Sequence, residues 1–164
     1  MREIYSTQPA YQRPSEFTHE EHTAIFLVGP TPRKASVPSW RPEAIQSLKD
    51  MNYQGTVLIP EPESGKRWND YDNQVDWERQ GLYNCDAIVA WVPRDMETMP
   101  ALTTNVEFGF WMGKEPKKVF YGRPADAFAT RYLDWMYRLY TGREPSFLLG
   151  DTLYNAVLSL RQTQ

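Results

Sequence analysis

The sequence predicts an α/β protein with a doubly wound parallel sheet in a single domain. Short apolar runs typical of buried strands alternate along the 164 residues with segments of helical periodicity, which is the pattern of βαβ units. The runs at residues 24–28 and 87–92 are almost continuously apolar, as expected for strands covered on both faces. No internal repeat or interdomain linker divides the chain, and its length suits one domain with a substantial core.

The N-terminal residues differ in character from the rest. Residues 1–22 are polar, contain two prolines and show no sustained periodicity. We therefore expect an N-terminal arm that packs on the body or on a second subunit. The α/β domain is expected to span residues 23–164.

The first part of this domain has the pattern of a βαβ unit. The strand at residues 24–28 ends abruptly in a proline-rich loop. Ser39 or Trp40 then caps a helix with Pro42 in its first turn, where the missing N–H costs nothing. A second strand follows at residues 56–60, and the polar loop after it is expected to border a site.

The second part continues the alternation. The helix expected at residues 74–84 turns Val75, Leu82 and Trp77 inward. The helix expected at residues 125–140, after the last strand, is strongly periodic in aromatic and aliphatic residues. The expected elements are a helix at residues 74–84, a strand at 87–92, a helix at 106–113 capped by Thr103, Thr104 or Asn105, a strand at 117–121, a helix at 125–140 with Phe128, Tyr132, Trp135 and Leu139 as its stripe, and a helix at 152–160.

Composition narrows the class of function. The net charge of −3 argues against nucleic-acid binding through phosphate neutralisation. Cys85 is the only cysteine, and both histidines lie in the arm, so we expect no disulfide, no zinc site and no other metal or cofactor. No apolar run of membrane-spanning length and no signal peptide is present, so a cytoplasmic protein without membrane contact is expected.

Polar residues are expected to converge at one edge of the sheet. Loops that follow parallel strands open on the same edge, where open α/β sheets bind their ligands. The arginines there suit a phosphate, although each is also explained by solvation or by pairing with Asp95 and Glu97. Tryptophans 40, 68 and 77 suit either stacking on a base or core packing. The residues expected in this crevice are Arg33, Arg41, Glu61, Arg94 and Glu107, with Asp76 and Glu78 added by the helix before the third strand.

Glu107 has two interpretations. An acid in the first turn of a helix modestly stabilises the helix dipole. A carboxylate beyond the end of a buried strand, flanked by large apolar side chains, is also a candidate nucleophile or general base. Neither a Gly-rich phosphate-binding motif nor a Ser–His or Cys–His pair offers an alternative centre.

From residue 24 to residue 124 the chain resembles the nucleoside 2-deoxyribosyltransferase superfamily, and in particular its nucleoside 2-deoxyribosyltransferase-like branch. Each motif is short, but together they occur in the family's order and spacing. The motifs are IFLVGP at residues 25–30, GPTPR at 29–33, SWR at 39–41, CDAIVA at 85–90, WVPR at 91–94 and TTNVEFG at 103–109.

The resemblance implies a flavodoxin-like or Rossmann-like domain that cleaves or exchanges the N-glycosidic bond of nucleosides or nucleotides. It makes Glu107 the nucleophile that forms a covalent glycosyl-enzyme, and it places Glu78 near the base and the departing nitrogen. It also implies a homo-oligomer, for which the aromatic helix near the C-terminus offers an interface unless it packs within the monomer. The residues expected to bind substrate are Gly29, Pro30, Thr31, Arg33, Trp40, Arg41, Glu61, Arg94, Thr103, Thr104 and Asn105.

Two differences from the family's pattern leave the choice between transfer and hydrolysis open. Phe26 stands where many members have tyrosine, and Ala101 stands where transferases tend to have aspartate and nucleotide hydrolases serine. Sugar and 5′-group contacts are therefore expected from Thr103, Thr104 or Asn105. The leading hypothesis is 2-deoxyribosyl transfer between bases. The alternatives are hydrolysis of a nucleoside 5′-monophosphate or of a dinucleotide such as NAD, and nucleotide sensing without turnover.

Overall fold

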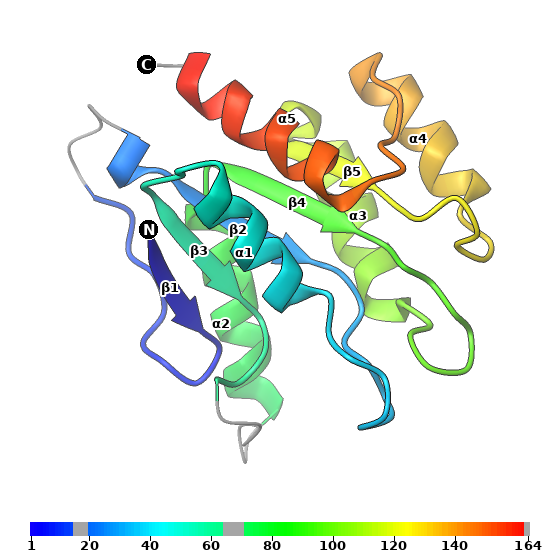
Figure 1. Ribbon diagram of the computed structural model, residues 1–164, viewed down its shortest axis with the longest axis horizontal. Coiled ribbons are helices and arrows are strands. Elements are labelled where there is room, and N and C mark those ends of the chain that lie inside the picture. The colour runs from blue at the N-terminus through cyan, green and yellow to red at the C-terminus, as the bar shows by residue number, and fades with distance from the viewer. Residues whose placement is uncertain (15–19, 64–70, 163–164) are drawn as a thin grey trace.

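The computed structural model describes residues 1–14, 20–63 and 71–162 (Figure 1). Within these residues it shows a five-stranded, all-parallel sheet in the order β1-β3-β2-β4-β5. The doubly wound α/β fold predicted from the sequence is confirmed. The strands are β1 (Arg2–Tyr5), β2 (Ala24–Val28), β3 (Thr56–Ile59), β4 (Ala87–Trp91) and β5 (Val119–Gly122), and the helices are α1 (Arg41–Asp50), α2 (Tyr71–Asn84), α3 (Leu102–Lys114), α4 (Arg131–Thr141) and α5 (Leu149–Gln162).

Helices cover both faces of the sheet. Helices α1 and α5 pack on one face, and α2, α3 and α4 pack on the other, so the core forms two layers (Figure 1). β2 and β4, which are buried along their whole length, lie side by side where the connections turn from one face to the other. The crevice at the carboxyl ends of these two strands is therefore the position at which an open α/β sheet binds its ligand. Apart from β1, the strand order is that of the flavodoxin-like arrangement.

The N-terminal segment contains a strand, β1, where the sequence analysis expected only an arm. Residues Arg2–Tyr5 form an edge strand that pairs in parallel with β3. A single residue of this strand, Ile4, is fully buried, because an edge strand needs fewer apolar residues than a central one. That short pattern explains why the sequence did not reveal it. The part of the arm at residues 15–19 lies outside the described residues.

Helix α3 begins earlier than expected. Its first residue is Leu102, preceded by Ala101 in a left-handed conformation (φ 57°, ψ 37°) with no side-chain cap. Thr103, Thr104 and Asn105 therefore lie inside the helix, and the prediction that they cap it is wrong. Glu107 consequently lies in the second turn, and the first turn carries no acid.

Helices α2 and α4 also differ from expectation. Helix α2 is longer, starting at Tyr71, and Val75 is exposed instead of inward, whereas Trp77 and Leu82 are buried. Helix α4 is shorter, because the chain turns through Ala129 in a left-handed conformation before the helix starts. The remaining helices and strands lie within a few residues of their expected positions.

Candidate active site

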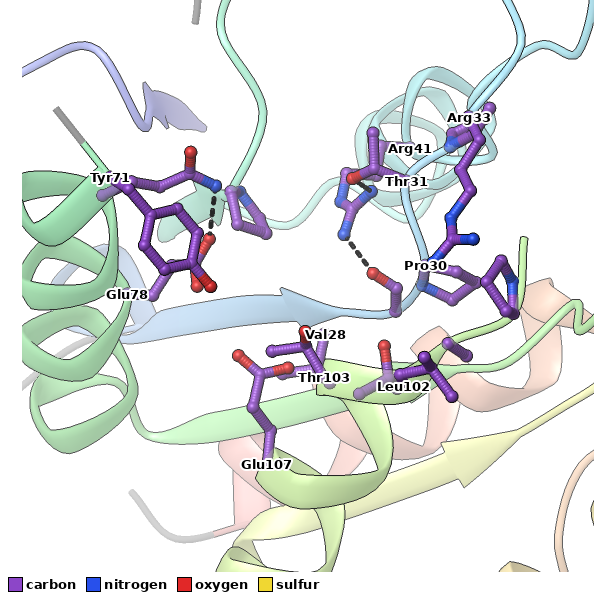
Figure 2. A pocket seen from close by; sticks show the side chains of 17 residues that line it. Val28, Pro30, Thr31, Arg33, Arg41, Tyr71, Glu78, Leu102, Thr103 and Glu107 are labelled. Carbon is purple, nitrogen blue, oxygen red and sulfur yellow. Dashed lines mark hydrogen bonds between the residues drawn. The ribbon is translucent and has the colours of Figure 1, made fainter. Parts of the chain in front are cut away.

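A pocket of about 270 Å³ opens beyond the carboxyl end of β2, and its lining includes Pro60, which directly follows β3. It lies between the loop after β2, the N-terminal half of α2 and the start of α3 (Figure 2). The structure brings together much of the predicted site there. The predicted residues that line it are Gly29, Pro30, Thr31, Arg33, Arg41, Glu78, Thr103, Thr104 and Glu107, whereas Trp40, Glu61, Arg94 and Asn105 lie outside its lining.

Two carboxylates from different helices point into this pocket. Glu107 projects from α3 and Glu78 from α2, and both side chains are partly shielded from solvent (Figure 2). Burial raises the pKa of Glu107 to about 8, and the negative charge of Glu78 adds to this effect. Burial also raises the pKa of Glu78. The Arg41 guanidinium acts in the opposite direction on both groups.

The two carboxyl groups therefore titrate as a coupled pair. In such a pair the first proton leaves readily, and the second leaves at a higher pH because two adjacent charges repel each other. The pKa of about 8 keeps Glu107 protonated in the free protein near neutral pH, and repulsion between the two charges favours states in which the pair holds a single proton. Such a pair can supply both a nucleophile and a proton donor.

The raised pKa of Glu107 predicts a pH-dependent stability. Its pKa is about 8 in the folded protein, against an ordinary value of 4.5. Above about pH 4.5 the unfolded chain releases this proton while the folded chain still holds it, so the stability of the folded state falls as the pH rises from about 4.5 through 8. Glutamine carries no such proton and does not share this loss. Glu107→Gln should therefore become progressively more stable than the wild type between these pH values, as measured by paired thermal melts. A stability difference that is independent of pH would contradict the shift.

Arg41 shapes the wall of the pocket. Its side chain is buried, and Nη1 donates to Glu61 Oε1 at 2.6 Å. Nη2 donates to the carbonyl oxygen of Gly29 at 2.7 Å, and Nη1 reaches Thr31 Oγ1 at 3.3 Å (Figure 2). The guanidinium thereby fixes the loop after β2. Most of its hydrogen-bonding capacity is used within the protein, which leaves little for a ligand.

Gly29 is required by a close approach of the backbone. A Cβ atom at this position would lie 2.3 Å from the Trp91 carbonyl oxygen and 2.7 Å from the Trp40 ring. Trp40 itself is buried and donates from Nε1 to the Pro30 carbonyl at 3.2 Å. Trp40 therefore stabilises the loop after β2 through this hydrogen bond, and Glu61 does so through its ion pair with Arg41, both from outside the pocket lining.

Arg94 links three segments of the chain. Its guanidinium donates from Nη2 to Asn105 Oδ1 on α3 and from Nη1 to the Ala129 carbonyl, at 2.8 Å, before α4. Because Arg94 is buried and outside the pocket lining, it anchors the start of α3.

Arg33 differs from the other two predicted arginines. It is exposed at the pocket rim, and no side-chain hydrogen bond or ion pair to it is found among the described residues. The neighbouring acids that were expected to compete for it are engaged elsewhere, Glu97 with Lys34 and Asp95 with Thr98. Arg33 is thus the pocket arginine best placed to meet an anionic group.

Among the lining residues that the sequence analysis missed, two belong to α2. Tyr71 and Gln74 share one face of α2 with Glu78, at positions i, i+3 and i+7. Gln74 Nε2 donates to Glu78 Oε1 at 2.9 Å and so orients that carboxyl group. Tyr71 presents its ring at the rim (Figure 2). The i, i+3, i+7 spacing could have indicated this shared face from the sequence. It was not recognised because the helix was expected to start at residue 74 and not at Tyr71.

Other candidates from the sequence lie away from the pocket. Asp76 is exposed and pairs with Arg79, and Trp77 is buried against Phe26. Trp68 lies outside the described residues. The part of the chain that the structure describes contains no cluster of His, Cys, Asp or Glu able to hold a metal ion. None of its helices is both long enough and apolar enough to cross a membrane.

Comparison with protein families identifies a relationship for most of the chain. The model of the nucleoside 2-deoxyribosyltransferase-like family matches residues 22–125. This segment is more than half of the chain, and it holds β2 to β5 and every pocket residue discussed above. No curated protein matches the chain.

Proposed function

The chain belongs to the nucleoside 2-deoxyribosyltransferase-like family, and from that premise we propose that it transfers a 2-deoxyribosyl group between bases through a glycosyl-Glu107 intermediate. The observation that carries the proposal is the pair formed by Glu107 and Glu78 in one pocket at the end of the sheet. One partly buried carboxylate and one carboxylic acid are the groups that cleavage of a glycosidic bond with retention requires.

The first step breaks the bond between the sugar and the departing base. The attack requires the proton of the pair to reside on Glu78, although burial favours it on Glu107 in the free protein. Glu107, once ionised, attacks the anomeric carbon, and the electrons of the C–N bond pass to the base nitrogen. Glu78 in its acid form gives a proton or a hydrogen bond to the base as it leaves. The positive charge that develops on the sugar is stabilised by the Glu107 carboxylate before the new bond is complete.

The second step reverses the first with a different base. A nitrogen of the incoming base attacks the anomeric carbon, and the Glu107 carboxylate departs with the electrons of the ester bond. Ionised Glu78 now accepts the proton that the incoming base loses. Gln74 keeps Glu78 oriented in both steps through its 2.9 Å hydrogen bond.

Hydrolysis of a nucleoside 5′-monophosphate is the second candidate. It is favoured by Arg33, which is exposed at the pocket rim, and by the N–H groups at the start of α3, which no side chain caps. Arg41 and Arg94 do not add to this case, because their guanidinium groups bind protein atoms. Water would then resolve the intermediate in place of the second base.

A substrate panel separates the two reactions. The protein is incubated with deoxynucleosides, their 5′-monophosphates and NAD, with and without an acceptor base, and the products are followed by chromatography. Exchange that requires the acceptor supports transfer, and free base without an acceptor supports hydrolysis. Binding without any turnover would refute both enzymatic proposals and would support the alternative of a nucleotide sensor.

Glu78→Gln should slow the departure of poor leaving bases most. Loss of a general acid costs about 10² to 10⁴-fold in rate, and the loss is smallest where the base leaves without protonation. The rate constants for a series of bases of different leaving ability measure this. Asp76→Asn is the matched control, because that exposed acid on the same helix lies outside the pocket lining. A uniform loss across the series would count against an acid role for Glu78.

A further inference from the structure

The side of α2 that faces the pocket carries three polar side chains in one row. Tyr71, Gln74 and Glu78 lie at positions i, i+3 and i+7, so they follow one another along the pocket wall. The proposed reaction uses Glu78 as the proton donor and Gln74 to orient it, and it gives Tyr71 no role. The hydrogen-bonding atoms that Gln74 and Glu78 leave unused are the ones that a base meets at this wall.

The hydrogen bond between Gln74 and Glu78 fixes the orientation of the amide. Gln74 Nε2 donates to Glu78 Oε1 at 2.9 Å. An ionised carboxylate only accepts hydrogen bonds, so the amide turns its NH₂ group toward Glu78 and its carbonyl oxygen away from it. No hydrogen bond to Gln74 Oε1 is found among the described residues, and this oxygen is not enclosed in the fold. Gln74 therefore presents an unused acceptor.

The same hydrogen bond decides which oxygen of Glu78 carries the proton in the acid form. Oε1 is occupied as the acceptor for Gln74, whereas Oε2 has no partner within residues 1–14, 20–63 and 71–162. The acid therefore holds its proton on Oε2 and can donate it from there. A ligand at this wall meets an acceptor, Gln74 Oε1, and a donor, the O–H at Glu78 Oε2, on hydrogen-bonded neighbours.

An acceptor beside a donor is complementary to one class of base edge. In adenine the amino group on C6 donates and the nearby N7 accepts, and in cytosine the amino group on C4 donates and the adjacent N3 accepts. Hypoxanthine and uracil have an oxygen in place of the amino group, and this oxygen would face the carbonyl oxygen of Gln74. Two opposed acceptors form no hydrogen bond, so both groups would stay unpaired.

This pairing also delivers the proton to an atom that promotes departure of the base. N7 of adenine and N3 of cytosine are basic ring nitrogens conjugated with the nitrogen of the glycosidic bond. A proton that Glu78 Oε2 donates there helps the ring to accept the electrons of the breaking C–N bond. Recognition of the amino group by Gln74 thus places the proton-accepting nitrogen opposite the acid.

We propose that Gln74 selects bases with an amino group beside a basic ring nitrogen, adenine and cytosine, over their oxo counterparts. Gln74 Oε1 accepts from the amino group, and Glu78 Oε2 donates to the ring nitrogen. This inference rests on the proposed function, because it takes the base of a nucleoside as the group that contacts Glu78. It adds the class of base on which the glycosidic bond is broken.

Tyr71 completes this base site without taking part in the selection. It lines the rim of the pocket and is 71% exposed (Figure 2). No hydrogen bond or ring contact to it is found in the part of the chain that the structure describes. An aromatic face stacks on any base, because every base has a π-face. Tyr71 therefore adds affinity for all bases alike, and Gln74 supplies the discrimination.

The test measures the affinity for free bases, which are not consumed because they carry no sugar. The wild type is titrated with adenine, hypoxanthine, cytosine and uracil, and binding is followed by NMR. The dissociation constants of the oxo bases should exceed those of the amino bases roughly 5- to 150-fold, as for one good bidentate contact. Gln74→Met keeps the size of the side chain without its acceptor, so it should make the constants of each pair nearly equal.

Two further variants control for unspecific effects. Gln80→Met is the matched control, because Gln80 is also a half-buried glutamine of α2 but lies outside the pocket lining. This variant should keep the preference for amino bases. Tyr71→Ala should weaken the binding of all four bases by a similar factor, roughly tenfold, and should keep the preference as well. Thermal melts verify that each variant is folded.

Equal binding of the four bases to the wild type, a preference for the oxo bases or no binding at all would overturn the inference. A Gln74→Met variant that retains the preference would overturn it too. Its failure is distinct from failure of the proposed reaction. Base exchange without any preference among bases leaves the reaction and removes the role of Gln74, whereas a Gln74-dependent preference without exchange supports that role and refutes the reaction.

Discussion

Replacement of Glu107 by glutamine is expected to abolish turnover while leaving the fold intact. Glutamine keeps the size and polarity of the side chain but cannot form the glycosyl ester. Removing a covalent nucleophile costs about 10⁴-fold or more in kcat. The loss should appear in the rate of base exchange under saturating substrate, with substrate binding retained in a calorimetric titration.

Glu115→Gln is the control for this substitution. Glu115 lies at the other end of α3, is exposed and is remote from the pocket lining. Its replacement should leave the rate unchanged. If Glu107→Gln instead kept a rate within tenfold of the wild type, the nucleophile role would be refuted.

Arg41→Met is expected to give the largest loss of stability. The substitution leaves the Glu61 carboxylate without its ion-pair partner and removes the donor to the Gly29 carbonyl. Breaking a buried ion pair by removing one partner costs about 3–5 kcal/mol. Urea denaturation of the variant should show this loss as a lower midpoint, and the pocket should lose ligand binding because the loop after β2 is no longer fixed.

Two further variants identify the cause. In Arg41→Met/Glu61→Leu no unpaired charge remains, so a substantial part of the stability should return. Arg33→Met, at an exposed position, should change the free energy of unfolding by no more than about 0.5 kcal/mol. An Arg41→Met variant as stable as Arg33→Met would show that the ion pair does not support the loop.

The central strands and the position of the pocket followed from the sequence. β2 and β4 are continuously apolar because helices cover both of their faces. Their carboxyl ends mark the switch point of the sheet, so the loop after β2 and the start of α3 had to lie near each other. β1 was missed because an edge strand buries few of its side chains.

The roles of the arginines depended on tertiary structure. Sequence places Arg33, Arg41 and Arg94 on loops and helix starts at one edge of the sheet. It does not show that Arg41 donates to the Gly29 carbonyl or that Arg94 donates to the Ala129 carbonyl. These acceptors are backbone atoms distant along the chain, and their positions are set only by the fold.

The apolar stripe of α4 shows another limit of sequence patterns. The periodicity of Tyr132, Trp135 and Leu139 correctly indicated a helix, but it does not specify what the stripe contacts. A stripe that packs on the protein's own core and one that packs on a second molecule have the same spacing. In the folded protein Leu133 and Tyr137 of α4 pack in the core, so the stripe of Tyr132, Trp135 and Leu139 faces solvent.

Trapping of the glycosyl-enzyme tests the central claim most directly. A 2-fluoro-substituted deoxynucleoside slows both steps by disfavouring positive charge on the sugar, and a second base is omitted so that the intermediate accumulates. Intact-mass analysis followed by peptide mapping should find one added glycosyl group, bound to the peptide that contains Glu107. Release of the base from this nucleoside without any adduct, or with the adduct on another residue, would contradict the account.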